Sequence, residues 1–217
     1  MLSLIWKEFY INRSSLAVPA ALFMGISAVG LITRSARTLA YVVPMLITYS
    51  GLIMPFFALG SAMLEEKNRT LPFLRTLPIR SDVVVASKFI APLLAALAWG
   101  CASALIFRIA GPYIAEISPG TVGIVAALCV SMLVTAVELV IFFKYGAAAA
   151  RMSILVLWGG GFLAGTALSS SSISADEALR AVLEAKPGQI AAAVAVVLAL
   201  YFAAMLMAQA IFRRKEM

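Results

Sequence analysis

Few side chains in this sequence could take part in catalysis, and their types exclude most enzyme chemistry. There is no histidine among the 217 residues, which excludes Ser-His-Asp and Cys-His catalysis and histidine-ligated haem. Cys101 and Cys129 both lie inside apolar runs, whereas a disulfide framework needs closely spaced cysteines on the solvent side. The phosphate-binding motifs GxxxxGK[ST] and GxGxxG are both missing, so any ATP site must lie on another chain.

Glu138 is the only acidic residue well inside one of the long apolar runs. A carboxylate in such surroundings is expensive, so it should face a cavity, pair with a cation, or be protonated. Glu138 is therefore a candidate substrate-pathway residue, as a substrate contact or as a partner for a cationic group. The alternative is a hydrogen bond to a neighbouring helix near the inner end of the run, a turn and a half before Lys144.

The elements that would position these groups are membrane helices. Apolar residues make up 63% of the chain and charged residues 12%, and the mean hydropathy is +1.02. A soluble domain could not bury this much apolar surface behind so few charges. The sequence predicts an all-α polytopic membrane protein with a single transmembrane domain over residues 1–217. The six predicted spans are residues 16–33, 39–64, 83–109, 121–143, 152–168 and 189–212.

Two further segments are predicted to be helical without crossing the membrane. Residues 1–15 read as an amphipathic interfacial helix, with Leu2, Ile5, Trp6 and Phe9 on the apolar side and Glu8 among the polar residues opposite. The alternative is a frayed N-terminal tail. Residues 169–187 are predicted to lie outside the membrane as an extracytoplasmic segment with a capped helix.

The distribution of basic residues predicts the orientation. With the N-terminus in the cytoplasm, twelve of the 17 lysines and arginines fall on the inner side and five on the outer side. Cytoplasmic loops of membrane proteins collect basic residues, so both termini are predicted to be cytoplasmic. The same rule explains the net charge of +7 without nucleic acid as a partner.

The cytoplasmic loop 65–82 has more apolar groups than a connector needs. Thr70 can cap a short helix, Pro72 is tolerated in its first turn, and Pro78 would end it. The apolar side chains on one face would be Phe73, Leu74 and Leu77. Such a helix suits insertion into a groove of a partner protein, although it could equally lie on the lipid headgroups.

The residues of this loop resemble a known family. Glu-Glu-Lys-Asn-x-Thr at 65–70, Phe-Leu-Arg-Thr-Leu-Pro-Ile-Arg at 73–80 and Asp-Val-Val-Val-Ala-Ser-Lys-Phe at 82–89 are similar to the loop between the second and third helices of ABC-2 type transporter permeases. The resemblance is strongest to small six-helix bacterial permeases, including subunits that export amphipathic peptides such as phenol-soluble modulins.

The resemblance implies a transport function that composition does not. In such permeases the loop forms a coupling helix that docks on a separate ATP-binding subunit. The docking element would comprise Glu66, Asn68, Thr70, Phe73, Leu74, Arg75, Leu77 and Pro78. Two permeases, identical or different, would assemble with two ATPases in the bacterial inner membrane. ATP and magnesium would be bound by the partner subunit, so this chain is expected to have no cofactor and no catalytic or metal-binding residue.

Three alternatives remain at this stage. The chain could be a scaffold whose cytoplasmic helix recruits a soluble protein without any transport. It could be a secondary transporter, although the spans hold few ionisable residues for ion coupling. A haem-export permease of the cytochrome maturation type has a similar length and topology.

Overall fold

The computed structural model describes residues 1–33, 36–68, 80–114, 120–169 and 186–214. Within these ranges the regular structure is entirely helical, which confirms the predicted all-α class. The helices are α1 (Leu2–Thr33), α2 (Ala36–Lys67), α4 (Ser81–Ile114), α5 (Gly120–Tyr145), α6 (Ala147–Ser169) and α8 (Pro187–Arg214).

Four of these helices contain an apolar stretch long enough to cross a membrane. The stretches are Pro44–Lys67, Ser81–Ile109, Thr121–Tyr145 and Pro187–Arg214. Each has at least 24 residues, and at about 1.5 Å per residue each exceeds the roughly 30 Å hydrocarbon core of a bilayer. The chain is therefore a multi-pass membrane protein.

The first helix is sharply bent. Its segments Leu2–Ser14 and Leu16–Gly30 meet at 59°, and together they are apolar enough to count as a fifth span. The bend separates the predicted interfacial helix from the predicted first span. In α6 the described apolar helix is shorter, Ala147–Leu157, so the predicted total of six spans stays a prediction.

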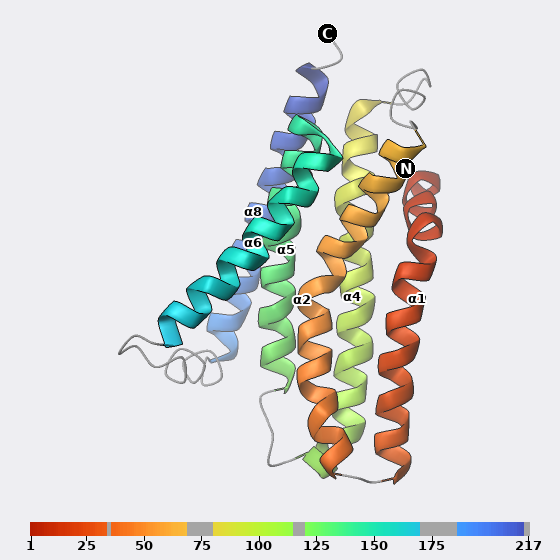
Figure 1. Cartoon of the computed structure of the whole chain (residues 1–217), viewed down its shortest axis with the longest axis vertical. Helices are drawn as coiled ribbons and strands as arrows, with labels where there is room; N and C mark the ends of the chain where they lie inside the picture. Colours follow the sequence, from red (N-terminus) through yellow and green to blue (C-terminus); the bar gives the residue numbers. More distant parts are fainter. Residues whose placement is uncertain (34–35, 69–79, 115–119, 170–185, 215–217) are drawn as a thin grey trace.

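The helices form one bundle with α2 and α5 at its centre (Figure 1). α2 packs against α1, α4 and α5, while α5 also packs against α8 and α6. The end of α2, the start of α4 and both termini lie at the same end of the bundle (Figure 1). At the opposite end α6 and α8 diverge from the other helices, and the α8 span is the least buried of the four.

The bundle is held together by interlocking aromatic rings and a few buried hydrogen bonds. Phe23, Tyr49 and Trp99 bring α1, α2 and α4 together through ring centroids 4.5–6.0 Å apart. The indole Nε1 of Trp99 donates to Ser50 Oγ at 2.9 Å. At the other side of the core the Tyr201 hydroxyl of α8 donates to the Phe89 carbonyl of α4 at 2.8 Å.

Several helix boundaries differ by a few residues from the sequence-based expectation, and two of these differences matter for the site. α2 continues through Glu65 to Lys67, so the first residues of the predicted loop 65–82 belong to a membrane helix. α6 begins at Ala147, inside the stretch that separates the predicted spans 121–143 and 152–168. Only Gly146 separates α5 from α6, and its φ of 95° is a conformation that glycine adopts without strain.

Candidate functional site

A cluster of buried charged side chains lies at the end of the bundle that carries both termini. It is called the charge cluster below and consists of Lys7, Glu8, Ser61, Glu65 and Lys88. The first two residues belong to the start of α1, the next two to the end of α2, and the last to the start of α4. Except for Lys7, each is at most 4% exposed.

Lys88 is the centre of the charge cluster. Its Nζ lies 2.7 Å from Glu65 Oε2 and 3.4 Å from Glu8 Oε1. The same ammonium donates a hydrogen bond to Ser61 Oγ at 2.9 Å. It also lies 5.5 Å from the centre of the Phe142 ring of α5, a favourable position for a cation over an aromatic face. A single side chain of α4 therefore contacts α1, α2 and α5.

Lys7 completes the charge cluster from its more exposed side. Its Nζ lies 2.6 Å from Glu65 Oε1 and 3.5 Å from Glu8 Oε1. The hydroxyl of Ser61 donates to Glu8 Oε2, so each oxygen of the two buried carboxylates has a hydroxyl donor or an ammonium group close by. Two ammonium groups face two carboxylates. Removing one charge would leave another buried without compensation, which is far more costly than losing the whole set.

Helical spacing explains how the sequence assembles this site. Glu8 and Asn12 are four residues apart on α1, and Ser61 and Glu65 are four residues apart on α2. Residues at this spacing lie on one face of a helix. Each helix thus presents a short polar stripe at the same end of an otherwise apolar bundle.

The two polar stripes approach closely because α2 has a glycine between them. Asn12 is 1% exposed, and its amide nitrogen donates to the Glu8 carbonyl at 3.2 Å. A methyl group added at Gly60 would lie only 2.5 Å from Asn12 Oδ1. The absence of a side chain at position 60 therefore allows the start of α1 to lie against α2.

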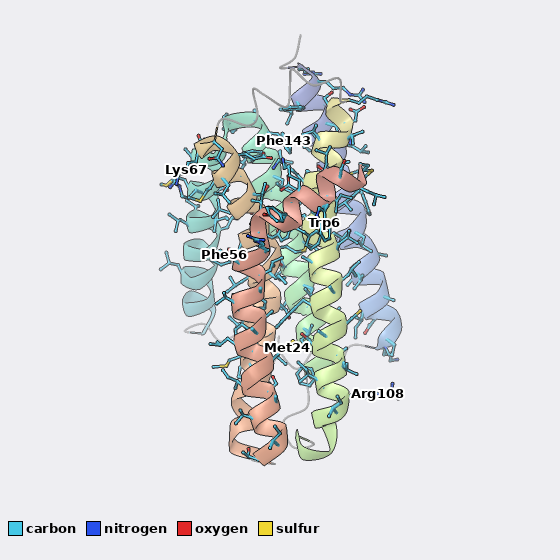
Figure 2. The ribbon with its side chains drawn as sticks, turned by 90° about the vertical axis from the view of Figure 1, so that its right-hand side faces the viewer. Trp6, Met24, Phe56, Lys67, Arg108 and Phe143 are labelled. Carbon is cyan, nitrogen blue, oxygen red and sulfur yellow. The ribbon has the colours of Figure 1, made fainter. Side chains whose placement is uncertain are left out.

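The N-terminal segment lies with its polar side toward the protein. Glu8 and Asn12 are buried, whereas Leu2 and Trp6 are 83% and 73% exposed. Phe9 lies between these two sides, and its ring packs edge-on against Phe57 of α2 with centroids 5.3 Å apart. Figure 2 shows this segment, which carries Trp6, turning away from the direction of the rest of α1. The segment is thus amphipathic, as predicted, but its polar stripe is a contact surface for α2 and α4.

A second polar contact fixes the first turn of α4. Asp82 accepts two hydrogen bonds from the Arg213 guanidinium of α8, both at 2.6 Å, and its backbone carbonyl accepts a bond from Gln209 at 3.3 Å. This contact is more exposed than the charge cluster, since 59% of the Arg213 side chain is accessible. The helix ends before and after residues 68–80 are therefore both held by polar contacts.

Two of the eight predicted docking residues lie within the described ranges. Glu66 is exposed in the last turn of α2, and Asn68 is exposed in the turn that follows, where its N–H donates to the Leu64 carbonyl at 3.0 Å. The other predicted docking residues lie outside the described residues. They are Thr70, Phe73, Leu74, Arg75, Leu77 and Pro78.

Glu138 lies in the middle of the bundle rather than in the charge cluster. Its side chain is 1% exposed, and within the described part of the chain neither carboxyl oxygen has a hydrogen-bond partner. The hydroxyls of Ser131 and Thr135, at helical spacing on the same side of α5, are likewise buried and without partners in that part. Its role in the substrate pathway stays a prediction.

An apolar groove runs along the membrane-facing side between α1 and α2. Its volume is about 510 Å³, and its lining includes Leu16, Phe23, Ile53, Phe56 and Phe57. Phe56 projects from α2 on this side and is 56% exposed (Figure 2). The described residues that line the groove include no charged side chain, so it suits an apolar chain better than a polar molecule.

The charge cluster was not predicted from the sequence. Glu65 was expected in the loop and Glu8 on the polar side of an interfacial helix, while Lys88 entered the motif at 82–89 and the count of cytoplasmic basic residues. One signal was available, because a lysine inside an apolar run needs a partner of opposite charge. The described residues contain no group of three or more His, Cys, Asp or Glu side chains that could hold a metal ion.

The apolar helices and the site at their end define a multi-pass helical membrane protein. The family model described as "ABC-2 family transporter protein" matches residues 3–213. The chain therefore belongs to the ABC-2 transporter family and is the permease subunit of an ABC transporter. This membership implies an ABC ATPase as its partner and confirms the family expected from residues 65–89. No curated protein matches the chain.

Proposed function

We propose that this permease exports its substrate across the bacterial inner membrane, with residues 68–80 acting as the coupling segment that docks on the ATPase. The supporting observation is that the end of α2 and the start of α4 lie beside both termini at one end of the bundle (Figure 1). Basic residues concentrate at that end, which favours a cytoplasmic location.

The proposed assembly has two permeases and two ATPase subunits, and ATP and magnesium are bound by the ATPases alone. The sequence of this chain supports that division because it has no phosphate-binding loop. The substrate pathway would run between the two permeases. Whether the two are copies of this chain or different chains does not alter the role of the coupling segment.

The proposed substrate is an amphipathic peptide or another hydrophobic compound. The resemblance of residues 65–89 to permeases for such peptides supports this class. The apolar groove between α1 and α2 supports it as well, since it lacks charged lining residues. Glu138 would contribute a contact for a cationic group of the substrate if it becomes accessible during transport.

The coupling role can be tested with the double variant Phe73→Ala, Leu77→Ala. Truncating buried anchor residues typically costs about 2 kcal/mol or more in binding, which corresponds to roughly thirtyfold weaker association. We expect the variant to insert normally but to lose the ATPase during purification, and its substrate-stimulated ATP hydrolysis should fall in parallel.

Phe202→Ala is the matched control, because Phe202 is an aromatic residue of α8 that is 42% exposed on the membrane side. It should retain the ATPase. Normal retention and normal stimulated turnover in the double variant would reject the coupling role. Loss of binding without any substrate-dependent hydrolysis in the unaltered complex would favour a scaffold instead.

A further inference from the structure

We propose that the charge cluster positions the coupling segment for the ATPase, with Glu8 and Lys88 as its positioning residues. This inference rests on the proposed function, because it assigns a purpose to a site next to the predicted docking segment. It adds a part of the chain that the docking motif does not include, namely the N-terminal segment Leu2–Ser14.

The location of the charge cluster is the first argument. Glu65 is two residues before Lys67, where α2 ends, and Lys88 is seven residues after Ser81, where α4 begins. Their ion pair, with Nζ 2.7 Å from Oε2, joins the two helices from which residues 68–80 extend. Any change in the separation of these helix ends must stretch or break this contact.

The second argument is the contact with α1. Glu8 accepts a hydrogen bond from Ser61 of α2 and lies 3.4 Å from the Lys88 ammonium of α4. One side chain of the N-terminal segment thus holds both helices that flank the coupling segment. A segment that only anchored the chain at the headgroups would not need to bury a carboxylate between two other helices.

The third argument is the choice of side chains. A well-packed apolar contact would stabilise the bundle as well as a buried charge pair does. Directional ion pairs instead define one separation and one angle between the helices. Such a contact suits a position where a movement of the ATPase must displace α2 and α4 together. A looser contact would let the coupling segment move without the helices.

The experiment uses the complete permease with its ATPase. Glu8→Gln keeps the size of the side chain and removes one charge. We expect its affinity for the ATPase to fall about tenfold, the change that corresponds to about 1.4 kcal/mol. Its melting temperature in detergent should fall as well, because the two lysines are left with one carboxylate, so affinity is measured on the folded fraction. Spin labels at Ser3 and Lys67, both exposed, should report a broader distribution of distances.

Charge exchange separates positioning from stability. Glu8→Lys and Lys88→Glu each leave the charge cluster unbalanced by two charges, and both should weaken ATPase binding. The double exchange restores two positive and two negative groups and opposite charges at positions 8 and 88. Because it places a second carboxylate beside Glu65, it should recover part of the lost affinity. Arg151→Gln is the control, because it removes an exposed charge of α6 outside the charge cluster.

Gly60→Ala tests the same idea without changing any charge. Its methyl group would meet Asn12 Oδ1, so the buried Asn12 amide and with it the N-terminal segment must shift from α2. Gly60→Val adds a larger side chain at the same position and enlarges this shift. We expect the distance between the labels to increase and ATPase affinity to fall together. If the labels move and the affinity does not change, the inference is wrong.

Failure of the inference can be told apart from failure of the proposed function. If the unaltered permease does not bind an ATPase through residues 68–80, the proposed function fails first. If it binds, but Glu8→Gln and both charge reversals bind equally well, only the positioning role is rejected. Folded single variants that the double exchange does not rescue would reject it too.

Discussion

Glu65 and Glu138 are both buried carboxylates in membrane helices, yet their surroundings are opposite. Glu65 is 2% exposed and lies 2.6 Å from the Lys7 ammonium and 2.7 Å from that of Lys88. Glu138 is 1% exposed and has no hydrogen-bond partner within the described ranges. A buried charge without compensation costs several kcal/mol or more. Glu65 therefore contributes to stability through its ion pairs, and Glu138 makes no such contribution within the described residues.

The comparison assigns different roles to the two carboxyl groups: Glu65 stabilises the arrangement of the helices, and Glu138 remains the candidate substrate-pathway residue. Glu65 is placed at a helix end, where side chains from three helices converge, and its contacts fix the helices relative to one another. Glu138 lies on the same side of α5 as Ser131 and Thr135, whose buried hydroxyls also lack partners among the described residues. By contrast, the Ser27, Ser50 and Ser87 hydroxyls bond to carbonyls of their own helices.

The largest effect that would distinguish the two regions is expected for Lys88→Met. The substitution keeps most of the side-chain volume and leaves Glu8 and Glu65 with Lys7 as the one remaining cation of the charge cluster. Breaking a buried charge pair by removing one partner typically destabilises by about 3–5 kcal/mol. We expect a large loss of folded protein in detergent and a much lower unfolding free energy in SDS titrations. An unchanged unfolding free energy would show that the charge cluster contributes nothing to the fold.

The next effect compares two identical substitutions. Glu65→Gln weakens contacts to two lysines, and because hydrogen bonds to charged groups contribute about 1.5–3 kcal/mol, it should lower the stability by a similar amount. Glu138→Gln replaces a buried carboxyl group that has no hydrogen-bond partner among the described residues, and it should be neutral or stabilising. Thermal unfolding of both variants side by side tests this order. A larger loss in Glu138→Gln would mean that this carboxylate has a structural partner.

The smallest effect is expected at the exposed end of α4. Asp82→Asn weakens the paired hydrogen bonds from Arg213, but the Arg213 side chain is 59% exposed and that of Asp82 is 20% exposed, so salt in the surrounding water screens this ion pair. We expect only a small decrease in melting temperature, which should vanish when the ionic strength is raised. A decrease as large as that of Glu65→Gln, insensitive to salt, would place this contact in the same class as the charge cluster.

The sequence by itself determined the class of protein. Long apolar runs with few charges can form only membrane helices, because each backbone polar group in lipid must be satisfied within its own segment. The residues at 65–89 were enough to predict the ABC-2 family, which the match over residues 3–213 confirms. The orientation inferred from the basic residues stays a prediction.

Only the tertiary structure decided how the charged residues are used. Glu8, Ser61, Glu65 and Lys88 are spread over 80 positions of the sequence, and no local pattern indicates that they meet. An amphipathic N-terminal segment can lay its apolar side on lipid or its polar side on protein, and periodicity is the same in both cases. The 59° bend of α1 and the missing side chain at Gly60 bring the segment against α2. Burial of its carboxylate then follows, because Lys88 supplies the opposite charge at that depth.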